Sequence, residues 1–153
     1  MKTKLHRSSH GSPLTGDLLR HLEEQVGKLP QDYADFLLST NGGEAVPELL
    51  FAVDLPGGET EVTIREFESV DCSRGAESVD LAIERWELYF GKGWLPVASD
   101  GCGNDYLMSL AEANRGEIFF RDHGQVDEDL PGSGLTSLAA SFSDFLAGLR
   151  ESR

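Results

Sequence analysis

The chain has 153 residues, with 27 acidic against 13 basic side chains and a formal net charge of −14 at pH 7. This length corresponds to one domain with a buried core. The negative charge disfavours direct binding to nucleic acid and to anionic membrane surfaces, which repel it. The same charge either favours association with a basic protein or serves only to keep the chain soluble.

The cysteine and histidine content limits metal and redox chemistry. Cys72 and Cys102 are too few for a disulfide framework or a four-cysteine zinc site, and the four histidines have no repeated metal-ligand spacing. No apolar run approaches the roughly 20 residues of a membrane helix, and residues 1–11 lack the apolar segment of a secretory signal. We therefore expect no metal, no cofactor, no membrane contact and a cytoplasmic protein with reduced thiols.

The N-terminal part predicts an arm followed by a helix. Residues 1–11 are basic and polar, and we expect a flexible arm that precedes a single domain over residues 12–153. Ser12 can cap a helix whose first turn contains Pro13, and Gly27 ends it. A four-residue apolar repeat predicts the buried stripe of this helix: Leu14, Leu18, Leu22 and Val26.

A second helix is predicted from Pro30, and strands follow it. Its expected buried face consists of Tyr33, Phe36, Leu37 and Thr40. The sequence Asn41–Gly43 accepts the left-handed conformation that ends a helix. Residues 49–53 form an apolar run of strand length, and residues 56–58 predict a turn. The alternation around Val62 and Ile64 predicts a strand that ends at Phe67 or carries a bulge there.

The third predicted helix opens at Ser78, a suitable N-cap residue. Its apolar positions recur at helical spacing: Val79, Ile83, Trp86 and Phe90. Gly91 and Gly93 then end the helix. We expect Trp86 to belong to the core, whereas Trp94, at the entrance of the next strand, fits either the core or an interface.

Residues 94–116 predict two strands joined by a polar turn at Asp100–Asn104, because Gly101 and Gly103 permit positive φ. In the second strand Tyr106 and Met108 lie on one face and Leu107 on the other. Apolar side chains on both faces are typical of a central strand.

The remaining chain predicts one more strand, a loop and a helix. Residues 117–121 form the strand, the acidic stretch 125–134 predicts an exposed loop, and the last helix is expected from Thr136 or Ser137. Its expected stripe is Leu138, Phe142, Phe145 and Leu149. The overall prediction is an α+β single domain, with a mainly antiparallel sheet of about 4–6 strands flanked by about four helices.

Three features could carry chemistry, and each has a simpler explanation. Asp100, Asn104 and Asp105 offer oxygen ligands to a hard cation, but their spacing is not that of a calcium loop. Cys102 with His123 or His21 could form a nucleophile and base, a pair of residue types that most chains of this size contain. The glycines at 101 and 103 are not followed by a helix and a third glycine, which excludes a dinucleotide loop.

Three segments carry a resemblance to a known family. They are LPQDYADFLLSTNGGE at 29–44, LPVASDGCGNDYLMSL at 95–110 and SFSDFLAGL at 141–149. Their order and spacing resemble the SUKH superfamily, the Smi/Knr cell-wall-regulator group, over residues 14–150. The resemblance implies a compact α+β protein-binding domain, with a groove or face on the sheet as the binding surface, rather than an enzyme.

Many bacterial members of this group resemble immunity proteins, so the resemblance implies a toxin partner, often a nuclease. The net charge of −14 favours a basic one. We expect this chain to bind it as a monomer or weak homodimer through side chains of the turn and the acidic loop: Trp94, Asp100, Asn104, Asp105, Asp127, Glu128 and Asp129. Two alternatives are a regulatory scaffold that binds another cellular protein or peptide, and a small hydrolase using Asp100, Asp105 or Cys102.

Overall fold

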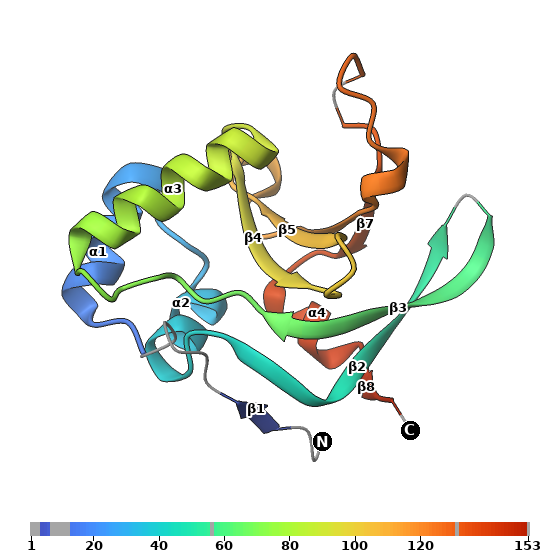
Figure 1. The fold of residues 1–153 in the computed structure, drawn as a ribbon, viewed down its shortest axis with the longest axis horizontal. Helices are drawn as coiled ribbons and strands as arrows, with labels where there is room; N and C mark the ends of the chain where they lie inside the picture. The colour runs from blue at the N-terminus through green and yellow to red at the C-terminus, as the bar shows by residue number, and fades with distance from the viewer. Residues whose placement is uncertain (1–3, 7–12, 56, 131, 153) are drawn as a thin grey trace.

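A single antiparallel sheet organises the structure, a computed structural model that describes residues 4–6, 13–55, 57–130 and 132–152. The described chain forms four α-helices and eight strands (Figure 1). The strands follow one another in the order β1 to β7, and β8 pairs with β2. The predicted α+β class and the four helices are confirmed, and the sheet has more strands than expected.

The helices are α1 (Gly16–Val26), α2 (Gln31–Ser39), α3 (Ala76–Phe90) and α4 (Phe142–Ala147). The strands are β1 (Lys4–His6), β2 (Gly43–Leu55), β3 (Gly58–Phe67), β4 (Trp94–Ser99), β5 (Asp105–Ser109), β6 (Ile118–Arg121), β7 (Leu135–Ala139) and β8 (Leu149–Glu151). Two short 3-10 turns complete the set, η1 (Glu112–Asn114) and η2 (His123–Gln125). The expected arm lies outside the described residues except for Lys4–His6, which pairs with β2.

Two helix starts differ from the prediction. Thr15 caps α1, because its side chain accepts a hydrogen bond from the Leu18 N–H; Ser12 lies outside the described residues. Helix α3 starts two residues before Ser78, after Gly75. The Ser78 hydroxyl donates to the Gly75 carbonyl and accepts from the Arg74 N–H, so it braces the first turn from within. The apolar positions predicted for these two helices are nevertheless largely buried, because the helical spacing of apolar residues is the same whichever residue caps the helix.

The prediction of a single C-terminal helix was wrong. Residues 135–139 form β7, Ser141 caps the short α4, and the chain then returns to the sheet as β8. The predicted apolar positions all pack against the core, but from three elements rather than one. Asp32 of α2 fixes α4 in place, because its carboxylate accepts hydrogen bonds from the Ser143 N–H and hydroxyl at 2.9 and 2.8 Å.

The core between α2, α4 and the sheet is rich in aromatic rings. Phe142 of α4 lies 4.9 Å from Tyr33 and 5.0 Å from Phe36, measured between ring centroids. Tyr106 of β5 and Phe51 of β2 both pack on Phe145. These contacts join both short helices to the sheet, and aromatic pairs of this geometry add to the free energy gained by burial.

Asn41 connects the end of α2 to the segment that follows β3. It is fully buried with a φ of 45°, and its side-chain amide donates to the Val70 carbonyl at 3.0 Å and accepts from the Val70 N–H at 2.9 Å. Next to it, a Cβ on Gly42 would lie 2.5 Å from the Glu68 carbonyl oxygen. The predicted helix stop is confirmed, and it also anchors residues 68–70.

Strand β5 is central, as predicted. It pairs with β4 on one side and β6 on the other, and Tyr106, Leu107 and Met108 are all buried. The Tyr106 hydroxyl reaches β3, where it donates to the Thr63 carbonyl at 2.8 Å. This hydrogen bond connects the centre of the sheet to the long β2–β3 hairpin, which extends away from the body of the molecule (Figure 1).

The two buried tyrosines should respond oppositely to loss of the hydroxyl. Tyr106→Phe removes a hydrogen bond and leaves the Thr63 carbonyl short of a donor, so unfolding free energy should fall by about 1 kcal/mol. The Tyr33 hydroxyl is buried with no partner among the described residues. Tyr33→Phe should therefore leave stability unchanged or raise it by up to about 1 kcal/mol. Urea denaturation measures both, and equal losses would contradict this assignment.

Candidate functional site

The turn at residues 100–104 is stabilised from within. The Asp100 carboxylate accepts hydrogen bonds from the N–H groups of Cys102 and Asn104, at 2.7 and 3.1 Å, and from the Asn104 side-chain amide at 2.8 Å. The turn joins β4 to β5 and sets their register, with Ser99 opposite Asp105. Asp100 and Asn104 thus use their polar atoms to hold the corner of the hairpin.

Asn104 also holds the next turn. Its side-chain oxygen accepts hydrogen bonds from the His123 N–H at 3.0 Å and from ring atom Nδ1 at 2.6 Å. His21 lies elsewhere, hydrogen-bonded to Asp80 between α1 and α3. Cys102 is exposed, and within the described part of the chain no group of three or more His, Cys, Asp or Glu is arranged to hold a metal ion.

One face of the sheet, here called the outer face, carries Trp94, Leu107, Phe119 and Arg121. Leu107 lies directly opposite Phe119 across β5 and β6, and Asp105 lies opposite Arg121. Trp94 packs edge-on against Phe119, with ring centroids 5.4 Å apart. Tyr106 and Phe120 point to the other face, toward α4. Two of the predicted side chains, Trp94 and Asp105, therefore belong to one surface.

The C-terminal end of α3 borders the outer face. A hollow of about 180 Å³ there is lined by three aromatic side chains of α3 together with Glu68, Arg85 and Asp105. The aromatic residues are Trp86, Tyr89 and Phe90. Tyr89 is 64% exposed, and its neighbour Leu88 is 81% exposed. This border combines carboxylates with apolar side chains that have solvent contact.

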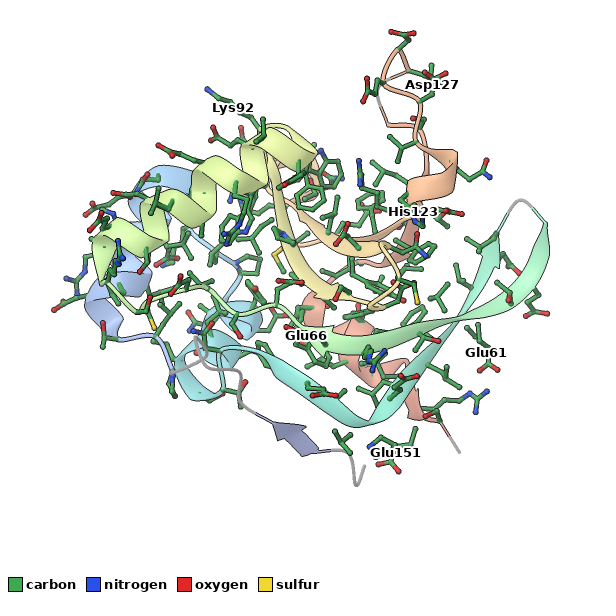
Figure 2. The ribbon with its side chains drawn as sticks, in the orientation of Figure 1. Glu61, Glu66, Lys92, His123, Asp127 and Glu151 are labelled. Carbon is green, nitrogen blue, oxygen red and sulfur yellow. The ribbon has the colours of Figure 1, made fainter. Side chains whose placement is uncertain are left out.

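The acidic loop borders the outer face on its other side. A second hollow, of about 150 Å³, is lined by Phe90 and Trp94 on one side and by Asp127 and Leu130 on the other. Leu130 is 60% exposed, and Asp127 lies far out on the projecting loop, with His123 at its base (Figure 2). Glu128 and Asp129 are exposed beside it, as the sequence predicts for a loop.

The hollow beside α3 holds carboxyl groups with altered proton affinity. Burial raises the pKa of Glu68 to about 7, the charges of Glu66 and Asp105 add to this, and Arg85 opposes it. Burial also raises the pKa of Asp105, against the effect of Arg121, whose Nη1 lies 3.9 Å from the carboxylate. Both shifts follow mainly from loss of hydration of the charged form.

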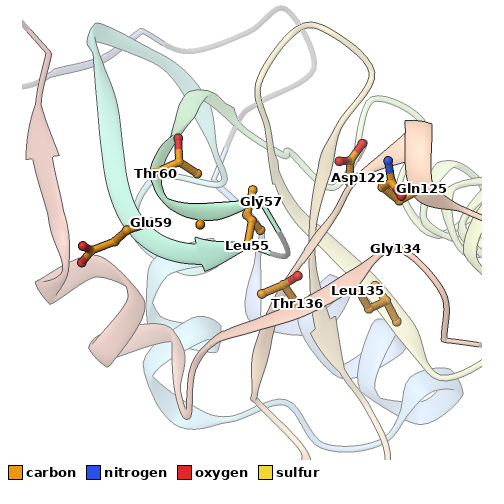
Figure 3. Close-up of a pocket in the computed structure, with 10 residues that line it drawn as sticks. Leu55, Gly57, Glu59, Thr60, Asp122, Gln125, Gly134, Leu135 and Thr136 are labelled. Atoms are coloured by element: carbon orange, nitrogen blue, oxygen red, sulfur yellow. The ribbon is translucent and has the colours of Figure 1, made fainter.

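A further cavity, of about 580 Å³, lies apart from the predicted residues. It separates the tip of the β2–β3 hairpin from η2 and the start of β7 (Figure 3). Its lining includes Leu55, Glu59 and Thr60 from the hairpin and Asp122 and Leu135 from the other side. The sequence prediction of a helix from Thr136 or Ser137 did not indicate this cavity, since two of its lining residues, Leu135 and Thr136, belong to β7.

The structure brings together some predicted residues and adds others. Trp94, Asp105 and Asp127 all line hollows at the outer face, whereas Asp100 and Asn104 stabilise their own turn. Sequence reasoning missed Glu68, Tyr89 and Leu130. Two sequence features could have indicated exposed apolar side chains: Leu88 and Tyr89 lie outside the apolar stripe of their helix, and Leu130 lies in a polar loop.

Comparison with protein families gives a match to the model of the SMI1 / KNR4 family (SUKH-1) over residues 13–148. The match covers nearly the whole domain, including the three segments whose resemblance was seen in the sequence. The comparison with curated proteins gives no match. Among the described residues, none of the helices has the length and apolar character needed to cross a membrane.

The backbone at Gly101 should tolerate side chains poorly. Its φ is 78°, and a Cβ would lie 2.9 Å from Cδ of Arg65. Gly101→Val should therefore lower the unfolding free energy by about 1–3 kcal/mol. Gly101→Asn is the matched control, because asparagine adopts positive φ more readily. Chemical denaturation checks both variants, and a valine variant as stable as wild type would contradict the strain.

Glu68 should make stability depend on pH. Its pKa is raised from 4.5 to about 7 in the folded protein. The folded state therefore binds more protons between these values, and this group's contribution to stability falls as the pH rises through that window. Glu68→Gln removes the cost of burying a charge, so the variant should be more stable than wild type at pH 8 by roughly 1–3 kcal/mol.

The gain from Glu68→Gln should largely vanish near pH 4, where the wild-type carboxyl is protonated in the folded state and mostly protonated in the unfolded state. Denaturation curves at several pH values measure the difference. Glu84→Gln, on the exposed side of α3, is the control and should show no such pH-dependent difference. A gain of equal size at pH 4 and pH 8 would show that packing, not charge, is responsible.

Proposed function

Since the chain belongs to the SMI1 / KNR4 family (SUKH-1), we propose that it is a non-enzymatic immunity protein that binds and neutralises a basic, nuclease-type toxin. The net charge of −14 supports a basic partner, because opposite charge raises the rate of association. The family resemblance described for the sequence supports a protein partner and a binding surface on the sheet.

The observation that carries the proposal is the composition of the outer face. Exposed Tyr89 and Leu130 stand at its two borders, on either side of half-buried Trp94. Interfaces typically place aromatic and apolar side chains at the centre and charged groups at the rim. The rim here carries Glu68 and Asp105 beside Arg85 on one side, and Asp127 beside Arg121 on the other. Glu128 and Asp129 add exposed negative charge next to Asp127.

The polar residues of the turn would support this surface from beneath. Asp100 and Asn104 fix the 100–104 corner and, through His123, the base of the acidic loop. We propose that they orient the loop, while Trp94, Asp105 and residues 127–129 contact the partner. Binding by a monomer is favoured, because two outer faces would bring like charges together.

Apolar contacts at the two borders should be essential for binding. The partner is first identified by co-purification with the products of genes adjacent to the chain's own gene, and by protection of cells that co-express the toxin.

With the partner in hand, Tyr89→Ala and Leu130→Ala should each weaken toxin binding by about tenfold or more, measured by calorimetry. Leu81→Ala is the control, since Leu81 is half-exposed on the same helix, two turns away.

Neutralising the acidic loop should act mainly on the association rate. A triple variant with amides at residues 127–129 should associate more slowly at low salt and show a weaker salt dependence. Toxin binding that is unaffected by the Tyr89, Leu130 and loop variants would reject the outer face as the interface. If no neighbouring gene encodes a protein that binds, and binding instead captures an unrelated cellular protein, the chain is a regulatory scaffold.

A further inference from the structure

The outward edge of β3 has backbone groups with no neighbouring strand. β3 pairs with β2 over most of its length. Its pairing with β4 is confined to Glu66 and Phe67. Within the described residues, the stretch 58–65 therefore has a strand on one side only. An edge of this kind presents N–H and C=O groups that can pair with another chain.

The register shows which residues present these groups. In an antiparallel pair, alternate residues direct both backbone groups toward the partner strand or away from it. The Thr63 carbonyl accepts from the Tyr106 hydroxyl of β5, so Thr63 directs its groups away from β2. The two-residue period then places the backbone groups of Glu59 and Glu61 on the same open side.

The 580 Å³ cavity adjoins this edge. Glu59 and Thr60 line it from β3, and Leu135 and Thr136 line it from β7, the last strand of the sheet order (Figure 3). Its volume falls within the range of about 300–1,000 Å³ typical of ligand sites. A segment that pairs with β3 would therefore enter a space bordered by strands on both sides.

The acidic side chains around the cavity favour a positively charged ligand. Among the described residues, its lining includes Glu59 and Asp122 but neither Lys nor Arg. Asp54 lies directly opposite Glu59 on the β2–β3 ladder, and both side chains are exposed. Like charges in directly opposed positions destabilise a ladder. A cationic side chain brought to this place would relieve the repulsion, whereas a second copy of this acidic chain would add to it.

We propose that the β3 edge at Glu59–Glu61, together with the adjoining cavity, binds an extended basic segment of the partner protein as an added strand. Strand addition gives affinity through main-chain hydrogen bonds and selectivity through alternate side chains. Glu61 already pairs with Arg150, so Asp54 and Glu59 are the acids that meet the Lys or Arg side chains of the segment. The inference rests on the proposed protein-binding function and names which part of the partner is bound, on a surface separate from the outer face.

A labelled peptide of alternating lysine and valine tests the proposal on the full chain. Fluorescence anisotropy measures its affinity, with a peptide of the same sequence and charge, N-methylated at every backbone amide, as the comparison. Methylation removes the main-chain donors, so the affinity should fall by about tenfold or more. Equal affinity for the two peptides would show attraction by charge alone and would overturn the proposal.

Variants of Glu59 separate backbone from charge. Glu59→Gln removes the carboxylate only, whereas Glu59→Pro also removes an N–H that points to the open side and leaves the β2–β3 ladder intact. The proline variant should bind the peptide about tenfold more weakly than the glutamine variant. Equal binding by both would contradict strand addition.

Hydrogen exchange on the wild-type chain keeps the proposal testable if the proline variant does not fold. Saturating peptide should slow exchange of the Glu59 and Glu61 amides by about tenfold or more. Unchanged exchange at both would overturn the proposal. So would a concentration-dependent dimer that protects the same amides without peptide, because the edge would then belong to a second copy.

The outcomes distinguish this inference from the function it rests on. If the toxin binds to Glu59→Pro as tightly as to wild type but not to Tyr89→Ala, the immunity function stands and the strand addition fails. If the peptide is bound with protection of Glu59 and Glu61 but no toxin partner is found, the strand addition stands and the immunity function fails.

Discussion

The hydrogen-bonded contact between Asn41 and Val70 is the constraint on which the arrangement of this protein depends. A buried side-chain amide makes hydrogen bonds to both the N–H and the C=O of one residue, 29 residues away in the chain. Gly42 also lies close to the Glu68 backbone. Together these two contacts hold the end of α2 against the connection from β3 to α3. The position of α3 and the burial of Glu68 both follow from this contact, because residues 68–70 have little freedom left.

The position of α3 in turn shapes the outer face. Its C-terminal end brings Tyr89 and Phe90 beside β4 and β5, so the hollow with Glu68 and Asp105 forms at their junction. The opposite border depends on the Asn104 contact with His123, which fixes the base of the acidic loop. Two buried or half-buried asparagine side chains thus place the borders of the surface that we propose for the toxin. The open edge of β3 arises separately, where the hairpin diverges from β4.

Local patterns predicted the elements whose burial is regular along one chain segment. The stripes of α1, α2 and α3 and the two-sided burial of β5 follow from periodicity, and the stop at Asn41 follows from its preference for positive φ. The pattern failed at residues 136–149, where Leu138, Phe142 and Phe145 have helical spacing but belong to β7 and α4. There the pairing of β7 with β6 and the hydrogen bonds from Ser143 to Asp32 outweigh the local preference. The candidate site could be predicted only in part. Trp94 and Asp105 have aromatic or polar side chains at a strand end, Leu130 is an apolar residue in a polar loop, and Glu68 carries no local signal.

The sequence by itself determined the α+β class, the net negative charge and the resemblance to its family. These properties depend on composition and on residues close together in the chain. Only the tertiary structure decided what the turn at 100–104 does, which acids share a hollow, and which strand edge stays open. Those properties depend on contacts between distant residues, such as Tyr106 with Thr63 and Asn104 with His123. No periodicity or motif in the sequence predicts such contacts, because they form, and stabilise the protein, only when distant segments come together in the folded chain.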